Sequence, residues 1–258
     1  MNIKNFAILG AVFGALLLPA AFTPASAQEE DISLPRQDWS FNGPFGTYDK
    51  ASAQRGFQIY KEVCSACHSL SLAYYRDLKG IGLSDDQIKA IAADATMPTT
   101  DDDGQPAERP GLPSDHFKSP FPNEKAARAA NNGALPPDQT LLVNAREGGS
   151  DYLYALLTGY ADAPADMKLA DGMNYNKFFP GHQIAMPAPL SDGRVDYSDG
   201  TKASLEQEAR DVTTFLTYMA NPEAEARKRI GLRVLIFLAA LTCVTYAVKR
   251  QVWSDVHH

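Results

Sequence analysis

The feature that most constrains this sequence is the segment 64–68, Cys-Ser-Ala-Cys-His. Two thiols three positions apart can bond to the two vinyl groups at one edge of a haem, and the histidine that follows can then face the iron. A thioredoxin-like pair would need a βαβ pattern, and a zinc site would need further ligands, although Cys243 is the only other cysteine. The motif therefore predicts one covalent haem c on Cys64 and Cys67, with His68 as an axial ligand.

An apolar run near the N-terminus predicts export. Residues 6–18 are uncharged and apolar, and they precede an Ala-Ser-Ala cleavage pattern at 25–27. The run is shorter than the roughly 20 residues that a membrane helix needs. We therefore expect a cleaved signal peptide over 1–27, rather than a retained anchor. Export would also deliver the chain to the oxidising compartment in which haem attachment is expected.

A second apolar run lies near the C-terminus. Residues 234–248 carry no charge, residues 227–229 are all basic, and Lys249 and Arg250 follow the run. These flanks favour a membrane helix over a buried core helix. We expect a basic stalk and transmembrane anchor over 227–250 and a tail over 251–258. The signal peptide places that tail in the cytoplasm, although the larger positive charge lies on the N-terminal flank.

The segment between these two ends is strongly acidic. Residues 28–226 contain 17 basic and 30 acidic side chains, a net charge of −13. Such a surface argues against nucleic acid as a partner, because phosphate binding needs a basic face. It favours a basic protein partner, unless the charge serves only solubility.

The haem motif is flanked by two predicted helices. The first covers 51–63, where Gly56 is either a close crossing point for another helix or a tolerated break. The second covers 203–220. Between them, segments such as 101–104 and 118–122 are acidic or proline-rich and predict surface loops. Since no strand pattern is strong, we expect an all-α fold with long irregular loops around one haem.

The second axial ligand must come from farther along the chain. Met186 lies in an apolar loop, 178–190, that three prolines stiffen. A neutral thioether binds iron weakly and must be held in place, so this loop makes Met186 the leading candidate. Met97 lies in an acidic stretch, and Met219 belongs to the predicted helix 203–220. The alternatives that stay open are Met167, Met173, His116 and His182.

Further motifs resemble the cytochrome c1 family of the cytochrome bc1 complex, in its alphaproteobacterial form. They occupy segments 123–138, 145–149, 151–152, 156–160, 179–186 and 199–201. The resemblance covers essentially the whole mature chain. It implies a cytochrome c-like haem domain with thioethers at Cys64 and Cys67, and with His68 and Met186 on the iron. It also implies that Arg146 pairs with a haem propionate and that the haem pocket includes Asn131, Pro137 and Tyr152.

The resemblance also implies a function. The chain would be the electron-transfer subunit of a quinol–cytochrome c reductase in the inner membrane, with its haem domain in the periplasm. It would work beside cytochrome b in a dimeric complex, take electrons from a Rieske iron–sulfur protein and pass them to a basic cytochrome c. The haem motif alone leaves two alternative functions open: a haem enzyme or gas sensor with an open iron site, and a haem-bearing scaffold for complex assembly.

Overall fold

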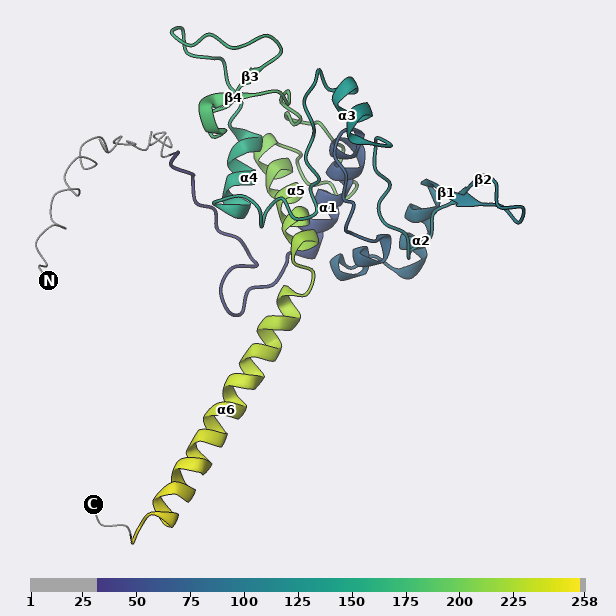
Figure 1. Ribbon diagram of the computed structural model, residues 1–258. Coiled ribbons are helices and arrows are strands. Elements are labelled where there is room, and N and C mark those ends of the chain that lie inside the picture. The colour runs from purple at the N-terminus through teal and green to yellow at the C-terminus, as the bar shows by residue number, and fades with distance from the viewer. Residues whose placement is uncertain (1–31, 256–258) are drawn as a thin grey trace, which may run out of the picture. The chain divides into compact units, whose positions relative to one another are not determined.

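The computed structural model describes residues 32–255, so the predicted signal peptide lies outside the described residues (Figure 1). The α-helices are α1 (Lys50–Glu62), α2 (Asp85–Ala93), α3 (Glu124–Ala130), α4 (Gly149–Thr158), α5 (Leu205–Ala220) and α6 (Ala224–Val252). The short 3-10 helices are η1 (Cys64–Ala66), η2 (Tyr75–Ile81) and η3 (Pro180–His182). The strands are β1 (Thr96–Thr100), β2 (Pro106–Pro110), β3 (Asn174–Tyr175) and β4 (Gln183–Ile184).

The centre of the fold is the crossing of α1 and α5, which confirms both predicted helices (Figure 1). Gly56 is required at this crossing, because a Cβ atom there would overlap the carbonyl oxygen of Asp211 and the Cβ atom of Phe215. The rings of Phe57 and Tyr60 lie 5.6 and 5.8 Å from that of Phe215. The glycine therefore lets the two backbones approach closely enough for these aromatic side chains to pack.

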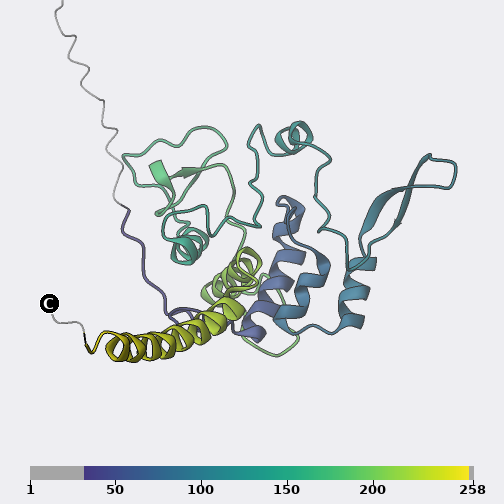
Figure 2. The ribbon, with the colours of Figure 1, turned by 60° about the horizontal axis from the view of Figure 1, so that its bottom comes forward.

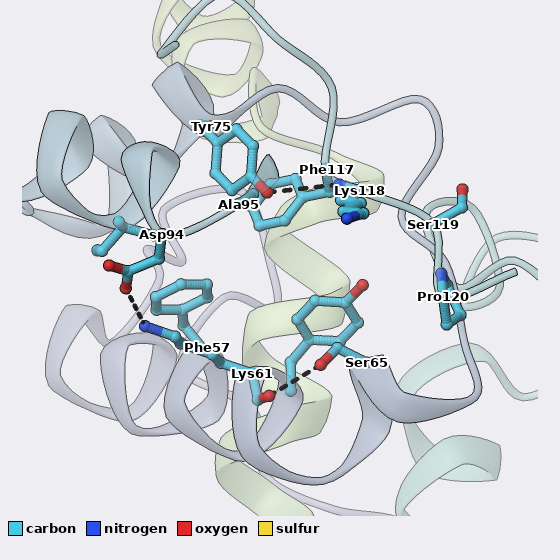
Figure 3. Close-up of a pocket in the computed structure, with 12 residues that line it drawn as sticks. Phe57, Lys61, Ser65, Tyr75, Asp94, Ala95, Phe117, Lys118, Ser119 and Pro120 are labelled. Carbon is cyan, nitrogen blue, oxygen red and sulfur yellow. Dashed lines mark hydrogen bonds and ion pairs between the residues drawn. The ribbon is translucent and has the colours of Figure 1, made fainter. Parts of the chain in front are cut away.

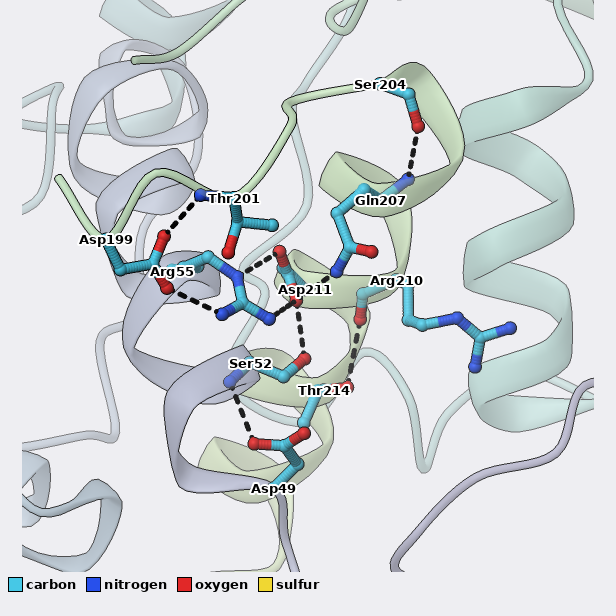
Figure 4. A network of polar contacts seen from close by, with 10 residues as sticks. All are labelled: Asp49, Ser52, Arg55, Asp199, Thr201, Ser204, Gln207, Arg210, Asp211 and Thr214. Atoms are coloured by element: carbon cyan, nitrogen blue, oxygen red, sulfur yellow. Dashed lines mark hydrogen bonds and ion pairs between the residues drawn. The ribbon is translucent and has the colours of Figure 1, made fainter. Parts of the chain in front are cut away.

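A buried polar network ties the same two helices together (Figure 4). The carboxylate of Asp211, on α5, is fully buried and accepts hydrogen bonds from Arg55 Nε at 2.8 Å and Nη2 at 3.1 Å. Ser52 and Gln207 also donate to Asp211, at 2.6 and 3.0 Å. Arg55 reaches Asp199 with its remaining nitrogen at 2.9 Å. The positive charge of Arg55 and the other hydrogen-bond donors thus compensate the buried negative charge of Asp211.

Two small antiparallel hairpins correct the expectation of an all-α fold. Strand β1 pairs with β2, and β3 pairs with β4. The first hairpin turns at Asp101, whose carboxylate accepts the amide hydrogens of Asp103 and Gln105, and at Gly104, which has a φ of 78°. Sequence reasoning assigned this acidic segment to an irregular loop because it lacks an apolar alternation. Its turn chemistry, rather than its hydrophobic pattern, is what closes the hairpin.

The long helix α6 follows α5 closely along the chain. It has 29 residues and a mean hydropathy of 2.0 over its apolar window, and none of that window is buried in the described structure. The alternative of a buried core helix is therefore wrong. Within residues 32–255, α6 is the one helix long and apolar enough to cross a membrane.

Candidate haem-binding site

The haem motif begins directly after α1. The chain turns through η1, and the carbonyl oxygen of Cys64 accepts the amide hydrogens of Cys67 at 3.1 Å and His68 at 2.9 Å. These two bonds bring both thiols and the imidazole to one tight turn. Side chains three positions apart lie on the same side of a 3-10 turn, so the turn places the two cysteines on one side of the chain, as the motif needs.

The environment of the cysteines fits a thioether bond. Burial, with a smaller contribution from the neighbouring Cys67, raises the pKa of the Cys64 thiol to about 12. A redox-active cysteine pair works through a thiolate with a lowered pKa, whereas a thioether carries no charge that burial would penalise. Among the residues that the structure describes, no group of three His, Cys, Asp or Glu side chains could hold a metal ion. Neither the thioredoxin-like nor the zinc alternative is supported.

His68 is held in the orientation that an iron ligand requires. Its ring is buried, and Nδ1 lies 2.8 Å from the carbonyl oxygen of Pro137. A carbonyl oxygen can only accept, so Nδ1 carries the proton and Nε2 keeps its lone pair for a metal. Burial lowers the pKa of His68, although the Pro137 bond opposes that shift, so the ring stays neutral.

Asp138 straps the Pro137 segment onto the haem motif. Its Oδ2 accepts hydrogen bonds from the Ser69 hydroxyl and the Ser71 amide, both at 2.7 Å. Burial alone would raise the pKa of Asp138, but hydrogen bonds from Thr140, Ser69 and Ser71 lower it, so the carboxylate stays charged. Sequence reasoning missed this residue, because its partners lie 67 and 69 positions away and a lone Asp after two prolines resembles an ordinary turn.

Met186 is positioned by a second set of contacts. It is half-buried and follows strand β4, whose Ile184 pairs with Asn174 of β3. The carbonyl oxygen of Met186 accepts a hydrogen bond from the Tyr160 hydroxyl at 3.1 Å. Burial raises the pKa of Tyr160, so the hydroxyl remains a donor. The small hairpin and Tyr160 therefore fix the backbone on either side of the Met186 side chain.

Arg146 and Tyr152 lie near Tyr160, the residue whose hydroxyl bonds to Met186. Burial raises the pKa of Tyr152, and the positive charge of the exposed Arg146 opposes that rise. Tyr152 in turn raises the pKa of Tyr160, so the three side chains are electrostatic neighbours. Asn131 has a different visible role: its side-chain amide donates to the carbonyl oxygen of Ala127 at 2.7 Å and closes the end of α3.

The chain matches the Cytochrome C1 family over residues 39–256. It belongs to the cytochrome c1 family. It is 46% identical to the cytochrome c1 of Rhodospirillum rubrum, over 91% of this chain and 92% of that one. It is 47% identical to the mitochondrial cytochrome c1 heme protein of Saccharomyces cerevisiae, over 90% and 75% of the two chains. It is 43% identical to a "Cytochrome b/c1" of Bradyrhizobium diazoefficiens, over 99% of this chain and 40% of that protein. The resemblance that the sequence motifs predicted is confirmed.

In this cytochrome c1-family chain, several rivals of Met186 have other roles. Met219 is buried in the core on α5, as its helix pattern predicted. The ring of His116 lies 3.9 Å from that of Tyr74. His182 is not distinguished in this way, because its Nδ1 lies 3.1 Å from the carbonyl oxygen of Asn176, the same kind of contact that His68 makes with Pro137. The remaining methionines within residues 32–255 are half-buried, with Met97 on β1 and Met167 and Met173 in the segment between α4 and β3.

A cavity of about 340 Å³ opens beside α1 (Figure 3). Its lining includes the rings of Phe57, Tyr75 and Phe117, and the ion pair of Lys61 and Asp94 at 2.9 Å stands at its edge. Neither of the two predicted axial ligands lines this cavity. Ser65, which lies between the two cysteines of the haem motif, does line it, so the cavity adjoins the motif in this cytochrome c1-family fold.

Proposed function

We propose that this chain is the membrane-anchored haem c subunit of a quinol–cytochrome c reductase and that it transfers one electron at a time. The observation that carries the proposal is the arrangement of His68, neutral and bound through Nδ1 to Pro137, on the turn that holds Cys64 and Cys67. Relatives named cytochrome c1, and one named a cytochrome b-c1 complex catalytic subunit in Candida albicans, support the same assignment.

The residues divide into those that hold the haem and those that hold its ligands. Cys64 and Cys67 would form the thioethers, and His68 and Met186 would be the axial ligands. When bound, the haem c supplies an iron that alternates between the ferric and ferrous states. His68 and Met186 would both stay bound in the two states, so the reorganisation would be small. A thioether ligand also favours a raised potential.

The supporting contacts would serve rigidity. The Asp138 strap fixes Pro137 and therefore the ring plane of His68. The Tyr160 hydroxyl and the β3–β4 pairing fix the loop of Met186. Outer contacts of this kind orient metal ligands and tune their basicity, so they are expected to set the reduction potential of the bound group.

The pocket residues are proposed from the family and from their charge. Arg146 is exposed and next to Tyr152, so its guanidinium is available to a haem propionate. Tyr152 would contribute an apolar ring to the pocket, as would Pro137 beside the ligand that it holds. Asn131 would act indirectly, by closing the α3 end that leads into the 131–137 segment.

The proposed topology follows from the two ends of the chain. Residues 1–27 would be removed, 28–226 would form a periplasmic cytochrome c domain, 227–250 would anchor it in the inner membrane, and 251–258 would lie in the cytoplasm. The exposed apolar surface of α6 supports a single membrane crossing. The partners would be cytochrome b and a Rieske iron–sulfur subunit in a dimeric complex, with the acidic 28–226 region facing a basic cytochrome c.

The electron-transfer test uses the purified full-length, haem-bearing chain in detergent. The chain is reduced and mixed with a basic oxidised cytochrome c, and the absorbance of both partners is followed in stopped flow. We expect direct electron transfer with a rate that falls steeply as salt is added, because opposite charges steer the encounter. If the chain and the cytochrome c exchange no electrons, the proposed function is contradicted. If the rate does not change with salt, the acidic docking face is contradicted.

A further inference from the structure

The loop 42–46 presents an aromatic side chain on the surface of the molecule. Phe45, at its tip, is 76% exposed, more than any other large apolar residue that the structure describes. The next most exposed are Val252 at 69% and Leu235 at 67%, and both lie on α6. Phe45 is thus exposed as fully as the most exposed apolar residues of α6, whereas the next most exposed large apolar residue of the domain, Leu72, is 58% exposed.

The loop is fastened to the first turns of α6. The Lys228 ammonium group donates to the carbonyl oxygens of Phe41 at 2.6 Å and Gly46 at 3.0 Å, one at each end of the loop. The amide of Tyr48 donates to Glu225 at 2.7 Å. Figures 1 and 2 both show the purple segment that contains this loop beside the start of α6. Lys228 therefore ties the loop 42–46 of the domain to the start of α6.

The position of Lys228 along α6 places the loop 42–46 at the level of the lipid headgroups. Residues 230–248, which include the uncharged run, cover about 28 Å of helix at 1.5 Å per residue, close to the roughly 30 Å of the hydrocarbon core, and Lys228 precedes them by two residues, or about 3 Å. The headgroup layer on each side of the hydrocarbon core is about 5–8 Å thick. The flanking Arg227 and Arg229 make the same level basic, which suits an anionic membrane surface.

We propose that the loop 42–46 is a second membrane contact, in which Phe45 inserts its ring into the interfacial region of the bilayer while Lys228 fixes the loop to the anchor. Phenylalanine is among the residues that interfacial membrane segments bury at the boundary between headgroups and acyl chains. The contact is continuous with the lipid-facing surface of α6, which is why lipid rather than protein is the occupant. Two attachment points would limit the rotation of the haem domain about its single helix. The proposal needs α6 in a membrane and is independent of the redox partner.

The test places a fluorophore at position 45. In the full-length, haem-bearing chain with Cys243→Ser, Phe45→Cys is labelled with a nitrobenzoxadiazole group. The protein is then reconstituted in vesicles of phosphatidylcholine and phosphatidylglycerol. The matched control is Leu112→Cys, another exposed apolar position, at 47% exposure. Emission, quenching by aqueous iodide and quenching by lipids with a nitroxide near the headgroup are measured for both, and the haem absorption spectrum checks that each variant is folded.

We expect the label at 45 to show blue-shifted emission, shielding from iodide and quenching by the nitroxide lipids, while the label at 112 remains water-exposed. Adding Lys228→Met should reduce the lipid quenching at 45, because the loop loses both of its hydrogen bonds to that side chain. Equal iodide quenching at 45 and 112 would overturn the proposal. Shielding that develops only in the assembled complex, with no lipid quenching, would also overturn it and would assign the loop to a partner subunit.

Discussion

At the scale of single residues, the site depends on side chains that prevent its ligands from moving. Nδ1 of His68 is hydrogen-bonded to the carbonyl oxygen of Pro137, and the carbonyl oxygen of Met186 accepts a hydrogen bond from the Tyr160 hydroxyl. The histidine and its motif could be predicted from the sequence, because their spacing is local. The strap by Asp138 and the bond from Tyr160 could not, since both join segments that only the folded chain brings together.

Replacing Met186 with leucine tests the second axial ligand. Leucine keeps the apolar volume but cannot bind iron, so Met186→Leu is expected to lower the reduction potential and to let carbon monoxide bind the reduced protein. The measurement is a potentiometric titration followed in the visible spectrum. Met173→Leu is the matched control and should leave both properties unchanged. If the two variants exchange these behaviours, the ligand is Met173.

At the scale of elements, the crossing of α1 and α5 combines a close backbone approach with a buried charge. Both helices were predictable from their apolar periodicity and from their ends. The close approach at Gly56 was one of two possibilities, and the structure decides in its favour. The carboxylate of Asp211 was not predictable as a buried group, because its partners, Arg55 and Ser52, lie on the other helix.

Removing the arginine from this network is expected to be strongly destabilising. Arg55→Met leaves the fully buried carboxylate of Asp211 without its cation and should cost about 3–5 kcal/mol of unfolding free energy. The measurement is guanidinium unfolding of the haem-bearing chain in detergent, followed by far-ultraviolet circular dichroism. Asp199→Asn removes only the exposed partner of the same arginine and should change stability much less. Equal losses in the two variants would show that burial of Asp211 is not the decisive factor.

The base of the β1–β2 hairpin should respond to acid. Two hydrogen bonds from Arg109, and one from the amide of Leu112, lower the pKa of Asp115 from its ordinary 3.8 to about 2. A lowered carboxyl pKa stabilises the fold above the ordinary value, and that contribution is lost as the pH falls from about 4 toward 2. Hydrogen exchange of residues 96–116, corrected for intrinsic rates, should show this loss of protection. Asp115→Asn should be less protected at neutral pH and lack the acid transition; an unchanged profile in that variant would contradict the assignment.

At the scale of the whole molecule, the fold combines an acidic haem domain with a basic, lipid-exposed helix. The C-terminal apolar run and the haem motif could be predicted because each depends on a short stretch of sequence, whereas the N-terminal apolar run lies outside the described residues. The hairpins are stabilised instead by turn chemistry and by Arg109 with Asp115, which hydrophobic periodicity does not detect. The cavity beside α1 likewise arises from packing between distant segments.

The central claim is that this chain carries a closed, six-coordinate haem c suited to electron transfer. The most direct test is the visible spectrum of the purified full-length chain, oxidised and reduced, with and without carbon monoxide. The account predicts a low-spin c-type spectrum that carbon monoxide does not change, because His68 and Met186 would occupy both axial positions. A high-spin spectrum, or one that shifts with carbon monoxide, would contradict it and indicate an open iron site, as in a haem enzyme or gas sensor.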